Sequence, residues 1–293
     1  LLALAGTLLF AAPAPALSPP VAPSEIVFAN GGRILTMEVR GGEREVIFGR
    51  NRIPANDGQG ASEPVASPDG RQVAFTFARR SGADELLDVW TVGSNGKGAK
   101  RILTSTRTMR FGDPVFSPDG RLVVAFFQAA ARFTRTGLIS VSANGGNRKN
   151  LLNLRQARRP YRAPVAVMEP DISPGGDRII YLLNESPAGV VFDEGFQNKL
   201  MVLNLRNGKS REVTSGAYEA TWSPNGRRIA YTHQTGDNDL ELCWWDLGCR
   251  FSASLAVINA DGSGQRLLTG SRIDERSPDW SVDNRIVFQS ARN

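Results

Sequence analysis

Ser67-Pro68-Asp69-Gly70 decides the fold, because this stretch returns four more times along the chain. Proline presets φ at the first corner of a turn, Asp or Asn bonds back to the backbone, and Gly accepts a positive φ. We therefore expect each copy to be a tight turn between two antiparallel strands. The later copies, spaced by 50, 56, 50 and 58 residues, are Ser117-Pro118-Asp119-Gly120, Ser173-Pro174-Gly175-Gly176, Ser223-Pro224-Asn225-Gly226 and the decayed Ser281-Val282-Asp283-Asn284.

A short apolar strand follows each turn, as in Val73-Ala74-Phe75 and Ile229-Ala230-Tyr231. A second hairpin follows all but the last of these strands, with Asn-Gly or Asp-Gly turns such as Asn95-Gly96 and Asp261-Gly262. Each unit is then four antiparallel strands in about 45 residues, which is a β-propeller blade. We name its strands A to D from the hub outward. The Ser-Pro-Asp-Gly turn joins A to B, and the Asn-Gly or Asp-Gly turn joins C to D.

The repeat resembles the WD-repeat-like unit of TolB-type propellers. The resemblance rests on Pro64-Val-Ala-Ser-Pro-Asp-Gly-Arg-Gln-Val-Ala-Phe75, on Ala220-Thr-Trp-Ser-Pro-Asn-Gly-Arg-Arg-Ile-Ala-Tyr231 and on the ending from Asp261 to Thr269, and it covers residues 24–293. It implies a six-bladed, periplasmic or secreted propeller that acts as an interaction platform. TolB also has a separate N-terminal domain, for which we expect no room here.

The number of blades depends on the two ends of the chain. Residues 25–50 supply strands B, C and D, and residues 277–290 supply strands A and B. If these pieces share one blade, the all-β ring has five blades and a surplus strand; if they do not, it has six and is incomplete. The resemblance favours six, with five as the alternative. We expect one propeller over residues 25–293, with its ends meeting because closure removes exposed sheet edges.

The N-terminal segment has the pattern of an export signal. An apolar run from Leu1 leads to the Ala-x-Ala site Ala14-Pro15-Ala16, so residues 1–16 are predicted to be a removed signal peptide and residues 17–24 a Pro-rich leader. A membrane anchor is the alternative, but the run before Pro13 is shorter than the roughly 20 residues that a spanning helix needs. We therefore expect a secreted or periplasmic protein with no transmembrane span in the mature chain.

Cysteine and charge content narrow the chemistry further. An exported chain places Cys243 and Cys249 in an oxidising compartment, which favours a local disulfide over a redox or metal site. His233 is the only histidine, so we expect no metal and no cofactor. The formal net charge of +6 is small and scattered. It favours anionic partners weakly, and we expect a monomer that does not bind nucleic acid.

The connections between strands divide into two sets. The A–B and C–D turns are short and leave on one face, which we call the plain face. The B–C and D–A connections leave on the opposite face, which we call the rim, and they carry nearly every insertion. Gathered long loops suggest a binding surface, with neutral drift as the alternative. The insertions are expected at residues 78–85, 128–137, 154–168, 184–199 and 233–254.

Three of these insertions hold candidate binding residues. The loop after His233 holds Trp244, Trp245 and Asp246 near the predicted disulfide, where the tryptophans contact a ligand or pack the loop on its blade. A basic loop over residues 155–162 suits an anionic polymer or lipid head groups, or is simply solvated. Carboxylates within residues 184–199 raise the idea of a calcium site, but their spacing matches no known loop. The basic loop's candidates are Arg158, Arg159, Tyr161 and Arg162.

An enzymatic function finds less support. The chain has no Gly-x-Ser-x-Gly elbow and no phosphate-binding glycine loop, and His233 has no second histidine to work with. Carboxylate pairs on the rim leave a propeller-type glycan hydrolase or lyase as the alternative. The sequence therefore predicts no catalytic residue. It predicts a TolB-like scaffold that binds a protein or a cell-envelope polymer through its long-loop rim.

Overall fold

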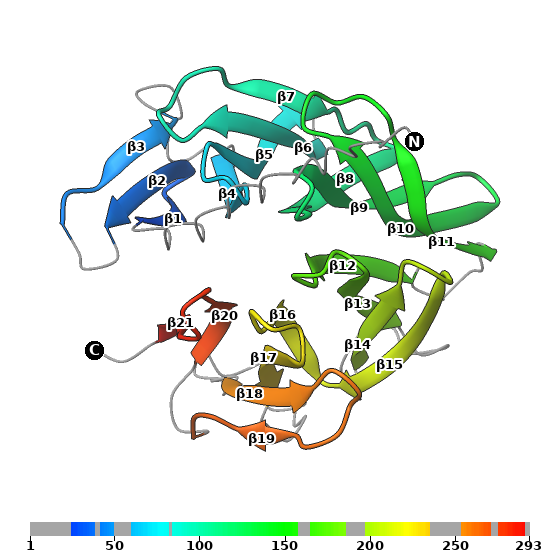
Figure 1. Cartoon of the computed structure of the whole chain (residues 1–293). Coiled ribbons are helices and arrows are strands. Elements are labelled where there is room, and N and C mark those ends of the chain that lie inside the picture. Colours follow the sequence, from blue (N-terminus) through cyan, green and yellow to red (C-terminus); the bar gives the residue numbers. More distant parts are fainter. Residues whose placement is uncertain are drawn as a thin grey trace, which may run out of the picture.

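The computed structural model of the chain describes residues 25–38, 42–49, 60–81, 84–157, 165–185, 197–234, 253–270 and 275–290. Regular structure in these ranges is all β, and the strands form six antiparallel sheets around a common centre (Figure 1). The predicted all-β propeller is therefore confirmed. Across these ranges, no helix is long and apolar enough to cross a membrane.

Four of the sheets are complete blades, which we number 2 to 5. In each, four consecutive strands pair in sequence order from A to D. Blade 2 is β4 (Gly60–Ala66), β5 (Gln72–Ser81), β6 (Asp84–Gly93) and β7 (Lys100–Leu103); blade 3 is β8 (Met109–Phe116), β9 (Arg121–Ala129), β10 (Phe133–Ser142) and β11 (Lys149–Ala157); blade 4 is β12 (Ala166–Ile172), β13 (Arg178–Glu185), β14 (Gln197–Asn204) and β15 (Lys209–Ser215); blade 5 is β16 (Ala217–Trp222), β17 (Arg228–Gln234), β18 (Ala253–Asn259) and β19 (Arg266–Leu267).

The two terminal sheets are partial. The first is β1 (Glu25–Asn30), β2 (Arg33–Glu38) and β3 (Glu45–Phe48), and the last is β20 (Glu275–Trp280) and β21 (Ile286–Ser290). Both lie on the same side of the ring in Figure 1, and the described strands show no pairing between them. Taken as one closing blade, they give a five-bladed ring, which is the alternative count. The two ends of the chain therefore meet on one side of the ring, as expected, but their described strands do not pair into one sheet.

The repeated turn has the predicted geometry. In the first copy, the Gly70 N–H donates to Ser67 O at 2.8 Å and the Ser67 hydroxyl donates to Asp69 Oδ1 at 2.6 Å. The same backbone bond closes every other copy, including the decayed one, where Asn284 takes the place of glycine with φ of 66°. Asn is the residue that best tolerates this left-handed conformation after glycine, so the fifth copy retains the turn without its glycine.

The two faces also separate as expected, with one correction. On the plain face, the Ser94 N–H donates to Arg71 O at 2.9 Å, which places a C–D turn beside an A–B turn. On the rim, residues 78–85 and 128–137 were expected to be loop insertions. They are instead elongated hairpins, because β5 pairs with β6 out to Ser81 opposite Asp84, and β9 pairs with β10 out to Ala129 opposite Thr134.

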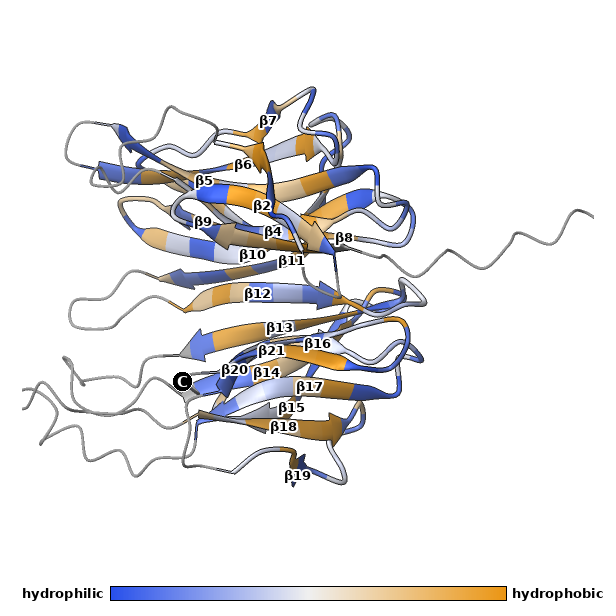
Figure 2. Ribbon diagram, turned by 90° about the vertical axis from the view of Figure 1, so that its left-hand side faces the viewer, coloured by the Kyte–Doolittle hydropathy of each residue, from blue (hydrophilic) through white to orange (hydrophobic). Residues whose placement is uncertain are grey.

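Apolar side chains between neighbouring blades form the core. Ala74 and Val89 of blade 2 belong to one buried cluster with Leu122 and Val124 of blade 3. Figure 2 shows hydrophobic stretches along the strands of the blades and hydrophilic residues in many of the connections. Each fully buried Val or Leu side chain contributes roughly 1.5–3 kcal/mol. Packing between blades therefore fixes the ring, and the polar contacts at its centre and rim are positioned on that frame.

Candidate functional site

The structure places only one of the predicted binding residues. His233 lies near the end of β17, opposite Ala217 and Ser254, and its ring is 6.1 Å from that of Tyr231 in an edge-to-face arrangement. The others remain predictions. Outside the described residues lie Arg158, Arg159, Tyr161, Arg162, Trp244, Trp245, Asp246, Cys243 and Cys249, together with residues 1–24 and most of residues 184–199.

A ring of polar residues at the hub was not predicted. The same place in each of the five A strands, four residues before the serine of the turn, holds a polar residue. These residues are Glu63, Asp113, Glu169, Glu219 and Ser277. Each has a positive φ between 48° and 53°. Each also sits at a β-bulge, where the pairing of the A strand with its B strand slips. Non-glycine residues adopt this conformation at a cost of roughly 1–2 kcal/mol, so the surroundings must compensate.

Hydrogen bonds from blade to blade supply that compensation. The Glu169 N–H donates to Asp113 Oδ2 at 2.9 Å, and the Glu219 N–H donates to Glu169 Oε2 at 2.6 Å. The Ser277 N–H then donates to Glu219 Oε2 at 2.8 Å. The Asp113 backbone likewise bonds the Glu63 carboxyl. The bulge turns each N–H toward the carboxyl of the preceding blade, so the strained residues join the A strands in one direction around the hub.

Burial changes the acidity of this ring. It raises the pKa of Glu63 to about 7, with the negative charge of Asp113 adding to the rise. Burial also raises the pKa of Glu169 to about 7, against the lowering effect of the Glu219 N–H. The Thr76 hydroxyl donates to Glu63 Oε2 at 2.8 Å, so this carboxyl is held from strand B as well. Carboxyls that titrate near neutral pH have the acidity that proton transfer requires.

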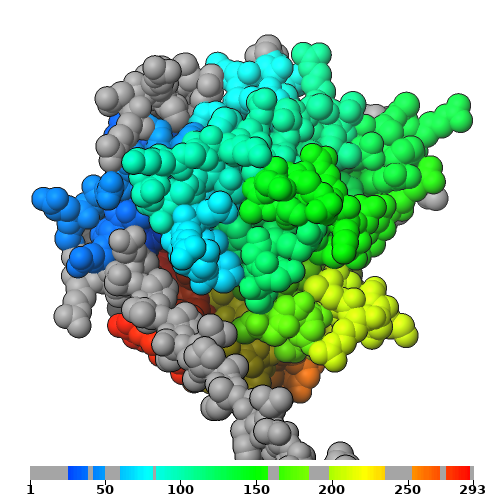
Figure 3. Space-filling view, turned by 45° about the horizontal axis from the view of Figure 1, so that its top comes forward, coloured from blue at the N-terminus to red at the C-terminus, as the bar shows by residue number. Residues whose placement is uncertain are grey.

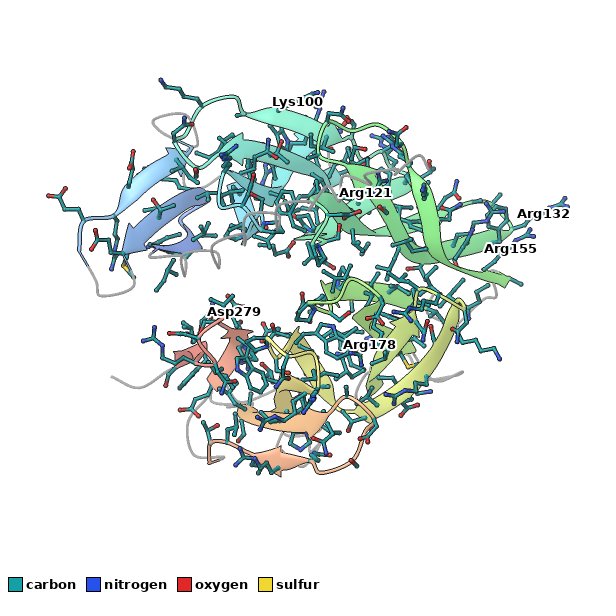
Figure 4. All side chains as sticks on the ribbon, viewed as in Figure 1. Lys100, Arg121, Arg132, Arg155, Arg178 and Asp279 are labelled. Carbon is teal, nitrogen blue, oxygen red and sulfur yellow. The ribbon has the colours of Figure 1, made fainter. Side chains whose placement is uncertain are left out.

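A second pair of hub acids, Asp171 and Asp279, lies two residues after Glu169 and Ser277 in the same strands. Burial raises the pKa of Asp171 to about 6, and the pKa of Asp279 is raised as well, although this residue is more open to solvent. Asp171 Oδ2 accepts the Trp222 N–H of the next blade at 2.8 Å, and Figure 4 shows Asp279 on the inner side of the last sheet. In the described ranges, no group of three or more His, Cys, Asp or Glu side chains is arranged to hold a metal ion.

The sequence did contain a signal for the hub acids. Glu63 and Glu219 stand one residue before Pro64 and Ala220, where the repeat that resembles TolB-type propellers begins. Extending the comparison by that single position gives Glu, Asp, Glu, Glu and Ser in the five copies. An acidic residue at a fixed distance before four of the five turns indicates a polar contact that repeats from blade to blade.

The second polar feature is on the rim, at the tip of the β9–β10 hairpin and the end of β11. Arg155 and Arg135 lie opposite each other in register, and their guanidinium carbons are 4.4 and 5.0 Å from the centre of the Phe133 ring. Arg132 is exposed in the adjoining turn. Figure 4 shows Arg132 and Arg155 together at this tip, and Figure 3 shows it projecting beyond its neighbours. Arg155 was expected in a loop, but it belongs to the paired strand β11.

These arginines differ from those of blade 2 in having no acidic partner. Arg79 and Arg101 both contact Asp88, and Arg107 contacts Asp84. Arg132, Arg135 and Arg155 form no ion pair within the described part of the chain. Guanidinium groups that stack on an aromatic ring keep their N–H donors at the edge free for a planar anion.

Comparisons with known proteins identify the fold. No family model and no curated protein matches the chain. Among solved structures, TolB from Acinetobacter baumannii superposes with a TM-score of 0.56 at 16% identity, over 88% of this chain and 55% of that one. The fold is that of a TolB-type propeller. The chain thus spans about half the length of that TolB.

Two further structures have the same fold. The TolB-type match extends to a putative TolB from Agrobacterium tumefaciens, with a TM-score of 0.54, 16% identity and coverage of 85% of this chain and 73% of that one. An oligogalacturonate lyase in complex with manganese also matches, with a TM-score of 0.54, 14% identity and coverage of 90% and 70%. Identities this low establish the TolB-like fold alone.

Proposed function

We propose that this TolB-like propeller is an exported binding scaffold that takes up a protein or a cell-envelope polymer on its rim. The observation that carries the proposal is the cluster of Arg135, Arg155 and Phe133, which has no acidic partner among the described residues, at the tip of a hairpin that extends beyond the blade. Arginine and aromatic side chains are the types most enriched at binding hot spots. The predicted Trp244–Trp245 pair would lie on the same rim, since its connection joins a B strand to a C strand.

The state of the hub carboxyls supports binding rather than catalysis. Glu169 and Glu219 each accept a backbone N–H of the next blade, so their oxygens already hold the ring together. A general acid or base must instead reach a substrate proton with the same oxygens. A structural role accounts for the repetition of these acids, because each blade needs the same link to the next.

Ligand capture by rim variants tests the proposal. The protein without its predicted signal peptide is immobilised and exposed to an extract of cell envelopes. Trp244→Ala with Trp245→Ala, and Arg135→Ala with Arg155→Ala, are expected to weaken capture, whereas Arg227→Ala on the plain face is expected to leave it unchanged. Equal capture by all variants, at unchanged melting temperatures, would show that the rim is not the binding surface.

A second candidate function is a glycan hydrolase or lyase that uses the carboxyls. The pKa values of Glu63 and Glu169, both about 7, favour it, as does the likeness of the fold to an oligogalacturonate lyase. The test is turnover of oligogalacturonate, followed by the ultraviolet absorbance of an unsaturated product. An activity that Glu169→Gln abolishes while the protein stays folded would establish catalysis. Absence of turnover across glycan substrates would leave the scaffold.

A further inference from the structure

Three polar side chains form a row across the tip of blade 3. Gln128 of β9 lies opposite Arg135 of β10, which in turn lies opposite Arg155 of β11. Residues directly opposite each other in antiparallel strands point to the same face of the sheet, and neighbouring strands are about 4.8 Å apart. The row therefore presents hydrogen-bonding groups at regular intervals, perpendicular to the strands. We call Gln128, Arg135 and Arg155 the arginine row.

The row is electrostatically unfavourable as it stands. Like charges directly opposite each other in a sheet destabilise the pair. Stacking on Phe133 offsets part of this cost by fixing both guanidinium groups over one ring. Within the described chain no acid approaches either arginine. A bound oxyanion would supply the missing counter-charge and use the forked donors of both residues at once.

We propose that the arginine row binds the acidic groups of a linear anionic polysaccharide. This inference rests on the proposed function, and it names the class of ligand for one part of the rim. Successive acidic groups of an extended polymer would meet Arg155 and Arg135 in turn, and Gln128 would bond a neutral hydroxyl next to them. Arginine suits this role better than lysine because its planar guanidinium group donates two parallel hydrogen bonds to one oxyanion.

The same observations argue against nucleic acid and lipid. Duplex binding needs many phosphate contacts over a broad basic surface. Several other arginines of the chain are already engaged, for example Arg178, which lies 4.7 Å from the Trp222 ring on the plain side and also contacts Asp177. Binding to a lipid surface gains from inserted apolar side chains, but guanidinium groups cover the Phe133 ring at the tip.

The test measures affinity for polygalacturonate by calorimetry, with wild-type protein and three double variants, of which the two glutamine variants have equal net charge. Arg135→Gln with Arg155→Gln is expected to raise the Kd at least tenfold. Arg227→Gln with Arg266→Gln is the matched control, because both residues are exposed and lie away from the row; its Kd should stay within about twofold. Arg135→Lys with Arg155→Lys retains the charge and should lose most of the affinity, since it lacks the fork.

Several outcomes would overturn the inference. The first is an equal loss of affinity for polygalacturonate in the two glutamine variants, and the second is wild-type affinity in the lysine variant. The third is binding of duplex DNA or anionic phospholipid vesicles as tight as that of polygalacturonate, or tighter, at the same ionic strength. If wild type binds no polysaccharide but still loses envelope capture when the rim tryptophans are removed, the inference fails while the proposed function stands. If rim variants change neither measurement, both fail.

Discussion

The backbone N–H of Glu219 donates a hydrogen bond of 2.6 Å to Oε2 of Glu169, one blade earlier in the ring. The Glu219 carboxyl in turn accepts the N–H and the hydroxyl of Ser277 in the following sheet. Asp113, Glu169 and Glu219 therefore each donate backward through the backbone and accept forward through the side chain. Hydrophobic packing holds the blades together along their strands, and this relay joins them at the centre, where the A strands are closest.

Removing one acid of the relay should destabilise the whole ring. Glu219→Ala leaves the Thr232 and Ser277 hydroxyls without their acceptor, and the Ser277 N–H retains only its 3.1 Å bond to Thr232 Oγ1. An unsatisfied buried donor costs about 1–3 kcal/mol, so we expect the free energy of unfolding to fall by roughly 2–4 kcal/mol in urea denaturation. Glu212→Ala, an exposed change in β15, should alter it by less than about 0.5 kcal/mol. Equal effects would mean that the relay contributes nothing measurable.

The raised pKa values of Glu63 and Glu169 predict a pH dependence of stability. Their pKa values are about 7 in the folded protein and 4.5 when unperturbed, so between these values the folded state binds more protons than the unfolded state. Their stabilising contribution is complete below pH 4.5 and is lost as the pH rises through 7. The melting temperature should therefore fall over this window. In the double variant Glu63→Gln with Glu169→Gln, the melting temperature should depend less on pH over this window. An unchanged pH dependence would mean that other groups cause it.

The sequence predicted what each blade repeats by itself and missed what depends on neighbours. Pro68 and Gly70 specify a local turn, so its geometry could be derived without the rest of the molecule. Glu63 joins its blade to the backbone of the following blade, so its role is visible only when the copies of the repeat are compared at that position. The prediction of a loop at residues 78–85 was wrong for a related reason. The hairpin of β5 and β6 extends beyond the core there, so its paired strands carry charged residues such as Arg80 and lack the apolar alternation that indicates a strand.

The glycine of the repeated turn provides a test of backbone conformation alone. Gly120 has φ of 77°, and a Cβ added there would meet no atom within 4 Å. Gly120→Ala should therefore cost only the left-handed backbone penalty, about 1–2 kcal/mol. Gly112 is the control, because it is equally open but has no positive φ. Gly112→Ala should leave the stability unchanged or raise it slightly. A similar loss in both variants would show that the turn does not require glycine.

Asp88 provides the sharpest contrast between a buried and an exposed charge. Its side chain is fully buried, accepts from Arg79 Nε at 2.7 Å and Arg101 Nη1 at 3.3 Å, and also accepts the Ser105 N–H at 2.8 Å. Asp88→Ala leaves the buried Ser105 N–H without its acceptor and the partly buried Arg79 guanidinium without its carboxylate, so we expect a loss of about 2–3 kcal/mol.

The Asp84–Arg107 pair, in the same blade, is the matched control for Asp88. Both side chains are largely exposed, at 36% and 71% respectively, so Asp84→Ala should cost about 0–1 kcal/mol and less still in high salt. Denaturation of the two variants in low and high salt separates the cases, because a buried pair is screened much less than an exposed one. A salt-sensitive, small effect for Asp88→Ala would contradict its burial. A large, salt-independent effect would show that Asp88 fixes β6 to the segment that leads from blade 2 into blade 3.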